Sequence, residues 1–356
     1  MLRLPLRAWP FFVVASLAAC GGDDSAGSTT TTSSTGAGGA TTTGAGGDGA
    51  GATTSTGTGG TGATTSTGTG GDGTGGDGAG GASACGTDWS AGHHSVPCDG
   101  GITYEVEIPA ACAQGPCGLV VDMHGYTMTA DSEDENTQMR ALGQQHGYVT
   151  VQPTAPKDNL NLPSWDQATH APLVYAFLLE VASALPIDPK RVHAMGFSQG
   201  GGMTFRLVCS HADFFASAAP AGALAGCEFS GADTPSEEVD ILQVHGRQDA
   251  IVNFDQIALP QRDAALGAWP FGAPAVLEDD GAHKATRWTT ASGTVFEFWE
   301  HDYQTTAQVA FVALKGHCVP GGLDFDGFPA GYSCLDPNTF VFGELAMQFF
   351  QAHTKP

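Results

Sequence analysis

The segment from Val192 to Met203 constrains the fold of this chain more than any other. It starts as an apolar run, places Ser198 between Gly196 and Gly200, and continues into a helix start. This is the setting of a nucleophile elbow, in which a serine hydroxyl is exposed on a tight turn above a parallel sheet. Glycine is expected on both sides because a Cβ there would collide with neighbouring backbone. Glycine is abundant, with 51 of 356 residues, so the motif needs support from its context.

Three parts of different composition follow one another along the chain. Residues 1–20 carry two arginines and an apolar stretch that ends at Cys20, a pattern typical of a bacterial lipoprotein signal peptide with an acylated cysteine. An ordinary signal peptide with a fortuitous cysteine is the alternative. Residues 21–84 contain only Gly, Ala, Ser, Thr and Asp, so they have no large apolar side chains to bury and are predicted to be a disordered linker. Residues 85–356 are predicted to form the catalytic domain, held at the cell envelope by the lipid or secreted.

The charge of the chain excludes some partners. The formal net charge is −24 at pH 7, and only five of the acidic residues lie in the linker. The domain itself is therefore acidic, which disfavours nucleic acid and anionic membrane surfaces and favours neutral substrates. We expect a monomer that contacts the membrane only through its N-terminal lipid and needs no cofactor.

The cysteines predict a disulfide framework. Of nine cysteines, eight remain when Cys20 is set aside for the lipid, and an even number in an exported chain indicates four disulfides. Sequence proximity favours the pairs Cys85–Cys98, Cys112–Cys117, Cys209–Cys227 and Cys318–Cys334. A metal site at His93, His94 and Cys98 is the alternative for part of this set. It lacks a second ligand pair at zinc spacing, so no metal is predicted.

Hydrophobic patterning predicts an α/β domain. Strands are expected at 102–108, 118–123, 148–151, 191–197, 240–244 and 295–299, and helices at 132–146, 173–185, 203–208 and 340–350. Strands that alternate with helices form a mostly parallel sheet covered on both faces. In such a sheet the functional loops lie at the carboxyl ends of the strands.

Two polar residues follow the elbow at positions that suit a catalytic triad. Asp249 lies on a glycine-containing loop after the strand at 240–244, and His317 lies on a Gly/Pro-rich loop after the apolar run 309–314. The order Ser198, Asp249, His317 is that of an α/β-hydrolase. An ordinary surface turn is the alternative for Asp249. The other candidates for the base are His283, His301 and His353, which lie in less suitable settings.

The three residues have complementary chemistry. The imidazole of His317 removes the Ser198 proton and later protonates the leaving group, while Asp249 fixes the tautomer of the imidazole. The oxyanion needs two donors. We expect the backbone N–H of Gln199, directly after the nucleophile, and that of Tyr126, after His124 and Gly125.

The domain resembles the extracellular esterase family that includes polyhydroxybutyrate depolymerases and feruloyl or acetylxylan esterases. The matching blocks are Met123–Tyr126, Ile187–Met203, Phe214–Gly222, His245–Asp249 and Gly316–Gly322. The resemblance implies an α/β-hydrolase fold and places Ser198, Asp249 and His317 at the triad positions. It also implies that Trp165 lines the acyl or sugar-side pocket, with simple core packing as the alternative.

The sequence departs from this family near the site. Gln199 stands where a small residue is common, and Val319 where many members carry Trp, with Cys318 between His317 and Val319. We expect a secreted, surface-tethered serine ester hydrolase acting on plant-wall esters or short hydroxyalkanoate oligomers. A peptidase of the same fold and a non-catalytic surface binding protein are the alternatives. A disulfide at Cys318 is expected to pin the His317 loop.

Overall fold

The structure, a computed structural model, describes residues 85, 88–113, 115–309, 311–323 and 332–356. All of them belong to one compact unit, Gly80–Pro356. The signal peptide, Cys20 and the linker lie outside the described residues, so the predicted lipid anchor stays a prediction. Within the described part of the chain, no helix is long and apolar enough to cross a membrane.

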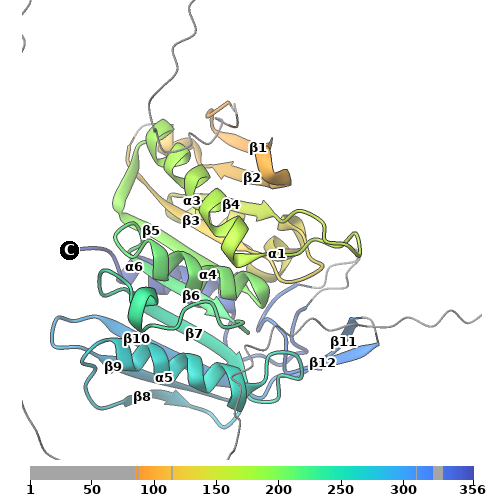
Figure 1. The fold of residues 1–356 in the computed structure, drawn as a ribbon, viewed down its shortest axis with the longest axis vertical. Coiled ribbons are helices and arrows are strands. Elements are labelled where there is room, and N and C mark those ends of the chain that lie inside the picture. Colours follow the sequence, from red (N-terminus) through yellow and green to blue (C-terminus); the bar gives the residue numbers. More distant parts are fainter. Residues whose placement is uncertain (1–84, 86–87, 114, 310, 324–331) are drawn as a thin grey trace, which may run out of the picture. The chain divides into compact units, whose positions relative to one another are not determined.

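A ten-stranded sheet forms the centre of the domain, in the order β1-β2-β4-β3-β5-β6-β7-β10-β9-β8 (Figure 1). Its strands are β1 (Gly92–Pro97), β2 (Thr103–Ile108), β3 (Cys117–Met123), β4 (Tyr148–Thr154), β5 (Ile187–Phe197), β6 (Ser217–Ala221), β7 (Asp240–Gly246), β8 (Ala275–Asp279), β9 (His283–Thr289) and β10 (Val295–His301). The pairs from β4 to β10 are parallel, and antiparallel strands flank them on both sides. A separate hairpin consists of β11 (Thr305–Val309) and β12 (Val312–Lys315).

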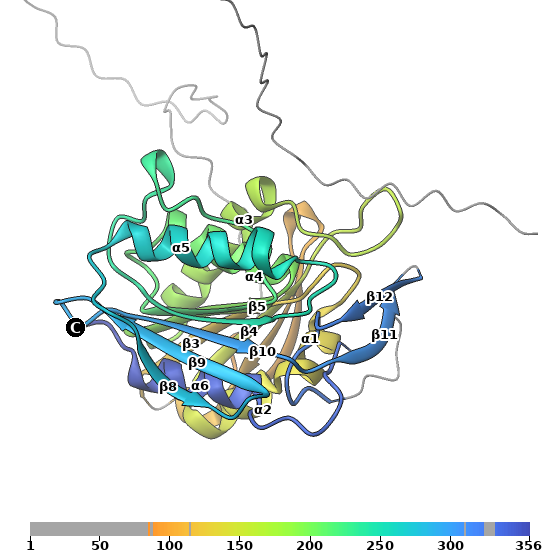
Figure 2. The same ribbon diagram turned by 90° about the horizontal axis from the view of Figure 1, so that it is seen from below.

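Helices cover both faces of the sheet, as Figure 2 shows. They are α1 (Ala130–Thr137), α2 (Met139–His146), α3 (Gln167–Ala184), α4 (Gln199–Ser210), α5 (Leu259–Ala268) and α6 (Phe342–Ala352). Short helical turns occur at Asp99–Gly101, Ala110–Ala113, Gly231–Asp233 and Phe254–Ala258. One face carries α3, α4 and α5, and the other carries α2 and α6. The predicted α/β-hydrolase architecture, a mostly parallel sheet between two helical layers, is confirmed.

The central strands explain where the functional loops lie. All seven residues of β3 are buried, as are the last six of β5, which is expected for parallel strands covered on both faces. The two strands pair in parallel, with Met123 opposite Gly196. The loop after β3 and the turn after β5 therefore leave the sheet side by side at its carboxyl edge.

Two predicted helices differ from the observed ones. The single helix expected at 132–146 is two helices, separated at Gln138, which has a left-handed φ of 54°. The Asp134 carboxylate accepts the backbone N–H of Arg140 at 2.9 Å and so begins the second helix. The helix expected at 173–185 begins earlier, because Asp166 caps it by accepting the N–H of Thr169 at 2.8 Å.

Several strands lack the pattern that a sequence interpretation requires. The buried strand β6 consists of small residues and a proline, whereas all five residues of β8 are exposed. Neither shows the apolar alternation of a half-buried strand.

Four disulfides join Cys85–Cys98, Cys112–Cys117, Cys209–Cys227 and Cys318–Cys334, so the predicted connectivity is confirmed.

Candidate active site

Ser198 stands on a strained turn between β5 and α4. Its φ is 58° and its ψ is −115°, a combination that non-glycine residues rarely adopt. A Cβ on Gly200 would lie 1.7 Å from the carbonyl oxygen of Met123, and one on Gly196 would lie 2.5 Å from the same oxygen. Neighbouring backbone therefore requires both glycines, as expected from the sequence. The turn presents the Ser198 hydroxyl at the carboxyl edge of the sheet.

The structure brings Ser198, His317 and Asp249 together in one hydrogen-bonded series. His317 Nε2 lies 3.0 Å from Ser198 Oγ, and His317 Nδ1 lies 2.6 Å from Asp249 Oδ2. All three residues are almost completely buried, with 6%, 2% and 5% of their surfaces exposed for Ser198, His317 and Asp249. The Asp249 carboxylate faces Nδ1, so Nδ1 carries the ring proton and Nε2 is free to accept the serine proton.

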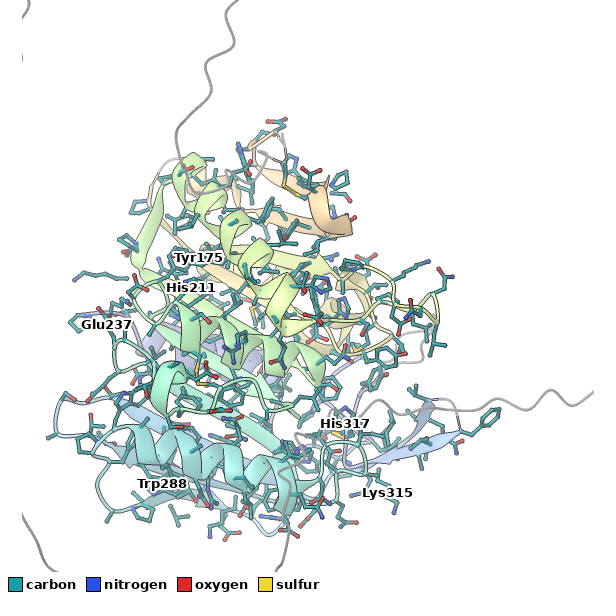
Figure 3. All side chains as sticks on the ribbon, viewed as in Figure 1. Tyr175, His211, Glu237, Trp288, Lys315 and His317 are labelled. Carbon is teal, nitrogen blue, oxygen red and sulfur yellow. A yellow bond between two sulfur atoms is a disulfide. The ribbon has the colours of Figure 1, made fainter. Side chains whose placement is uncertain are left out.

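Backbone contacts between two loops bring the acid and the base together. The N–H of Gly316 donates to the carbonyl of Gln248, and the N–H of Ala250 donates to that of Leu314. A Cβ on Gly316 would lie 2.8 Å from the carbonyl carbon of Gln248. The approach is thus close enough to require glycine in the His317 loop. Figure 3 shows His317 near Lys315, the last residue of β12. The backbone of Lys315 pairs with that of Asp249 in an isolated antiparallel β-bridge.

The surroundings of Asp249 favour its charged form. Its Oδ1 accepts the backbone N–H groups of Ile251 at 2.8 Å and Val252 at 2.7 Å. Burial alone raises the pKa of Asp249, but the charge and hydrogen bond of His317, the nearby His245 and the Val252 N–H together lower it below its ordinary value. A carboxylate held in this way can stabilise an imidazolium on His317.

The two expected oxyanion donors lie next to the nucleophile. Gln199 is the first residue of α4, where backbone N–H groups have no partner within the helix and the helix dipole is positive. The Tyr126 loop lies close by, because a Cβ on Gly125 would be 3.2 Å from the Cβ of Ser198. An oxyanion binding between these N–H groups stays a prediction that this arrangement permits.

His124 holds the Tyr126 loop in place, a role that the sequence did not reveal. Its Nδ1 donates to the carbonyl of Gly125 at 2.6 Å, and its Nε2 accepts the N–H of Ala155 at 3.0 Å. Burial lowers the pKa of His124 to about 4, so the ring is neutral and fits this donor–acceptor pattern. The partner Ala155 is distant in sequence, so no local pattern indicated it.

Tyr332 is a second residue that sequence analysis missed. Its hydroxyl donates to the carbonyl of Tyr126 at 3.2 Å and lies 3.2 Å from Thr127 Oγ1. Its ring packs against Phe197 and His317, with centroids 5.5 and 6.3 Å away. Tyr332 thus connects the histidine side of the site to the Tyr126 loop.

Trp165 lies in the core beside the site. Only 6% of its surface is exposed. Its indole N–H donates to the carbonyl of His124 at 2.9 Å, and its backbone N–H donates to the side-chain oxygen of Gln199 at 3.0 Å. These contacts match the packing alternative, and a direct contact of Trp165 with substrate stays a prediction. They also give the unusual Gln199 side chain a function, because it holds the Trp165 segment against α4.

The competing histidines are engaged elsewhere. His283 Nε2 lies 3.0 Å from Glu278, and His353 Nδ1 lies 3.0 Å from Asp240. His301 is buried on β10 and stacks on Tyr303. Among the described residues, His317 is the histidine with a hydrogen bond to Ser198.

The residues of the metal alternative have other partners. Cys98 forms a disulfide with Cys85, and His93 faces Glu105 and Glu107. Across the described ranges, no group of three or more His, Cys, Asp or Glu side chains is arranged to hold a metal ion.

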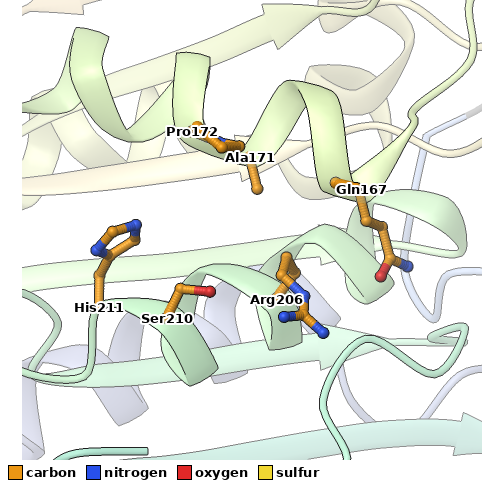
Figure 4. Close-up of a pocket in the computed structure, with 7 residues that line it drawn as sticks. Gln167, Ala171, Pro172, Arg206, Ser210 and His211 are labelled. Carbon is orange, nitrogen blue, oxygen red and sulfur yellow. The ribbon is translucent and has the colours of Figure 1, made fainter. Parts of the chain in front are cut away.

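A groove of about 450 Å³ lies on the helical layer, between α3 and α4 (Figure 4). It is lined by Gln167, Ala168, Ala171, Pro172, Arg206, Ser210 and His211. The groove contains none of the three residues of the hydrogen-bonded series, so the candidate active site is defined by the loops at the sheet edge.

The architecture is that of the α/β-hydrolase fold, and the Ser–His–Asp geometry lies where that fold places its functional loops. The acetyl xylan esterase from Aspergillus awamori shares this fold, with a TM-score of 0.52 at 15% identity over 73% of this chain and 99% of that chain. No protein-family model matches the chain.

Parts of the chain are similar in sequence to acetylxylan and feruloyl esterases. A bifunctional acetylxylan esterase/xylanase from Neocallimastix patriciarum is 29% identical over 141 residues, 39% of this chain and 20% of that protein. Feruloyl esterase B from Piromyces equi is 38% identical over 81 residues, 22% of this chain and 15% of that protein. Acetylxylan esterase A from Aspergillus ficuum is 25% identical over 177 residues, 47% of this chain and 54% of that protein. The matches span about half or less of these relatives' own lengths. The predicted resemblance to feruloyl and acetylxylan esterases is confirmed.

Proposed function

We propose that residues 85–356 hydrolyse carboxylic esters through an acyl-enzyme on Ser198. The observation that carries the proposal is the series from Ser198 Oγ through His317 to Asp249, with distances of 3.0 and 2.6 Å. A serine hydroxyl is too weak an acid to attack an ester unaided, so it needs a base at this distance. The esterase relatives support the same reaction class.

Acylation uses each member of the series once. Ser198 Oγ attacks the carbonyl carbon of the ester while its proton passes to Nε2 of His317. The negative oxygen of the tetrahedral intermediate accepts hydrogen bonds from the backbone N–H groups of Gln199 and Tyr126. When the intermediate collapses, the imidazolium gives its proton to the leaving alkoxide and an acyl-Ser198 ester remains.

Deacylation repeats these steps with water. His317 removes a proton from the water that attacks the acyl carbon, and the proton then returns to Ser198 Oγ as the acid leaves. Asp249 stays ionised throughout and stabilises the imidazolium in both halves. The lowered pKa of Asp249 supports this role.

The substrate we propose is a neutral ester of acetic or ferulic acid on a plant-wall saccharide. The names of the relatives, acetylxylan and feruloyl esterases, support this choice, and the net charge of −24 disfavours anionic substrates. A short hydroxyalkanoate ester remains the second candidate from the sequence resemblance. We further propose that the lipid on Cys20 and the linker hold the domain outside the cytoplasm at the cell envelope.

The test compares three substrate classes with Ser198→Ala as the blank. Oxidised residues 85–356 are incubated separately with acetylated xylo-oligosaccharides, methyl ferulate and 3-hydroxybutyrate oligomers, and the released acid is measured. We expect release from the first or second substrate and a loss of about 10⁴–10⁶-fold in the variant. Release of acid from the hydroxybutyrate oligomers alone would show that the substrate is a hydroxyalkanoate ester and not a plant-wall ester.

If Ser198 does not react with a fluorophosphonate, the proposed hydrolase activity is wrong and the binding-protein alternative is favoured. If the protein cleaves peptides and none of the three esters, the peptidase alternative is favoured.

A further inference from the structure

The turn that carries Asp249 contacts a second buried histidine. His245 is the penultimate residue of β7 and is completely buried. Its Nε2 lies 2.9 Å from the carbonyl oxygen of Val252 and 3.4 Å from Asp249 Oδ2. The mechanism described above does not use His245, although its ring reaches the same carboxylate as His317.

These contacts close a ring around the Asp249 turn. His245 Nε2–H donates to the carbonyl of Val252, and the N–H of Val252 donates to Asp249 Oδ1 at 2.7 Å. Asp249 Oδ2 then faces both His317 Nδ1, at 2.6 Å, and His245 Nε2. The Asp249 carboxylate is therefore connected to strand β7 in two ways: by the backbone and by the side chain of His245.

The protonation of His245 fits this arrangement. Burial lowers the pKa of His245, and His317 also lowers it, while Asp249 and the Val252 carbonyl oppose the shift. The neutral ring carries its single proton on Nε2, which faces the carbonyl oxygen of Val252. Nδ1 then bears a lone pair, and among the described residues it has no hydrogen-bond partner. Among the described residues, further titratable groups near His245 lie on strand β10, which pairs with β7: His301, and Glu300 opposite His245.

We infer that His245 is a positioning residue for the candidate triad, because its Nε2–H fixes the turn that aims Asp249 at His317. The inference rests on the proposed function, since it assigns His245 a role in the same reaction. Its physical basis is the precision that catalysis requires: a misplacement of about 1 Å can cost about 10²-fold in rate. A carboxylate on a turn after a strand needs an anchor of this kind to stay within reach of the imidazole.

A matched pair of variants distinguishes the effect of losing the N–H donor of His245 from the effect of losing its packed ring. His245→Gln keeps an N–H donor at the end of the side chain, whereas His245→Met has similar length and no donor. His301→Met is the control, because it removes a neighbouring buried histidine that makes no hydrogen bond to Asp249 or Val252 among the described contacts. Thermal unfolding of all three variants measures how much each substitution costs in stability.

The first readout is the rate at which a fluorophosphonate labels Ser198, which requires no knowledge of the natural substrate. We expect His245→Met to lower this rate and kcat by about tenfold, with KM changed less than about twofold. His245→Gln should recover most of the loss, and His301→Met should keep the wild-type rate. If the wild-type chain is not labelled, the proposed function fails. If it is labelled and His245→Met matches it, only the present inference fails.

The pH profile tests positioning directly. The acidic limb of kcat/KM reports the pKa of the base in the free enzyme. When Asp249 moves away from His317, the imidazolium loses stabilisation, so the limb of His245→Met should move to lower pH. The downfield NMR resonance of the His317 Nδ1 proton should move upfield in the same variant. An unchanged limb and resonance, with only a lower melting temperature, would show a structural role and overturn the inference. A limb that moves to higher pH would overturn it too, because the donor would then act on the charge of Asp249 alone.

Discussion

Asp249 and Glu133 are both buried carboxyl groups, yet their surroundings differ in almost every respect. Asp249 lies after β7 and accepts hydrogen bonds from Ile251, Val252 and His317. Glu133 lies in α1 with no exposed surface, beside the carboxyl group of Asp122 and the side chain of Asn136, and among the described residues no backbone N–H donates to its carboxyl oxygens. The pKa of Asp249 is lowered, whereas burial and the charge of Asp122 raise that of Glu133 well above its ordinary value. The charge of His317 together with the N–H donors, and not depth of burial alone, distinguishes Asp249 from Glu133.

The neighbour of Glu133 shows the same rule in an intermediate case. Asp122, on β3, accepts from Thr137 at 2.7 Å and from Gln152 at 2.8 Å through one oxygen, while its other oxygen has no partner among the described residues. Burial dominates over these two neutral donors and raises the pKa of Asp122 to about 7. Asp249 has His317 as a directly hydrogen-bonded partner, whereas the cation near Asp122 is Arg140, which lies against Asp131 and Asp134 and lowers the pKa of Asp122 too little to offset burial. We therefore call Asp249 and His317 the charged cluster, and Glu133 and Asp122 the protonated cluster.

The largest expected effect tests the charged cluster. Asp249→Asn keeps the shape of the side chain but removes the charge and presents an N–H to His317, which favours the wrong tautomer. We expect kcat/KM for the ester substrate to fall by about 10⁴-fold while KM changes little. Steady-state kinetics across pH 5–9 checks this result.

A suitable control is Asp255→Asn, which removes an exposed carboxylate six residues along the chain from Asp249. It should keep the wild-type rate. A loss of less than about tenfold in Asp249→Asn would mean that the buried charge is not used in the reaction, and the contrast with Glu133 would then have no functional meaning.

The sequence could predict those features that depend on neighbouring residues or on chain order. The elbow at Ser198 is local, and the position of His317 after a late strand follows from the order of the fold. The supporting contacts could not be predicted, because each joins side chains that are distant in sequence or depends on one exact turn geometry. His124 reaches Ala155, and the break of a helix at Gln138 is accompanied by a hydrogen bond from the Arg140 N–H to the Asp134 carboxylate, which periodicity does not show.

Removal of the Cys318–Cys334 disulfide should affect activity less than Asp249→Asn does. The disulfide joins the residue after His317 to the segment of Tyr332, and Val319 also bonds Tyr332 and Cys334 through backbone N–H and C=O groups. Replacing both cysteines with Ser should lower kcat by about tenfold, because the His317 loop loses its anchor and the base leaves its position. The relative fall in melting temperature should be smaller than the relative loss of kcat. Ester hydrolysis and thermal unfolding of the double variant measure the two effects side by side.

The matched control is the Cys112→Ser/Cys117→Ser variant, whose disulfide closes a short loop at the start of β3, far along the strand from its carboxyl end. It should lose stability and keep its rate. Unchanged activity in the Cys318/Cys334 variant would show that the backbone contacts alone hold the His317 loop.

The smallest expected effect concerns the protonated cluster and is visible in stability. The folded-state pKa values of Glu133 and Asp122 are raised, so the folded state binds more protons than the unfolded state above pH 4. Stability from this cluster is therefore present at low pH and is lost as pH rises through about 7, the pKa of Asp122. Glu133→Gln cannot ionise and removes the part of this loss that comes from Glu133 itself. We expect its melting temperature at pH 8 to exceed that of the wild type by a few degrees, at about 2–4 °C per kcal/mol for a domain of this size.

The advantage of Glu133→Gln should shrink toward pH 5, where the wild-type carboxyl group is protonated as well. Glu135→Gln makes the same substitution in the same helix at a partly exposed position, so its melting temperature should differ little from that of the wild type at every pH. A Glu133→Gln variant that is less stable than the wild type at pH 8 would mean that the carboxylate is ionised and neutralised by a bound cation. In that case the two clusters would be alike, each holding a negative charge against a positive partner, and the contrast drawn from their donors would be wrong.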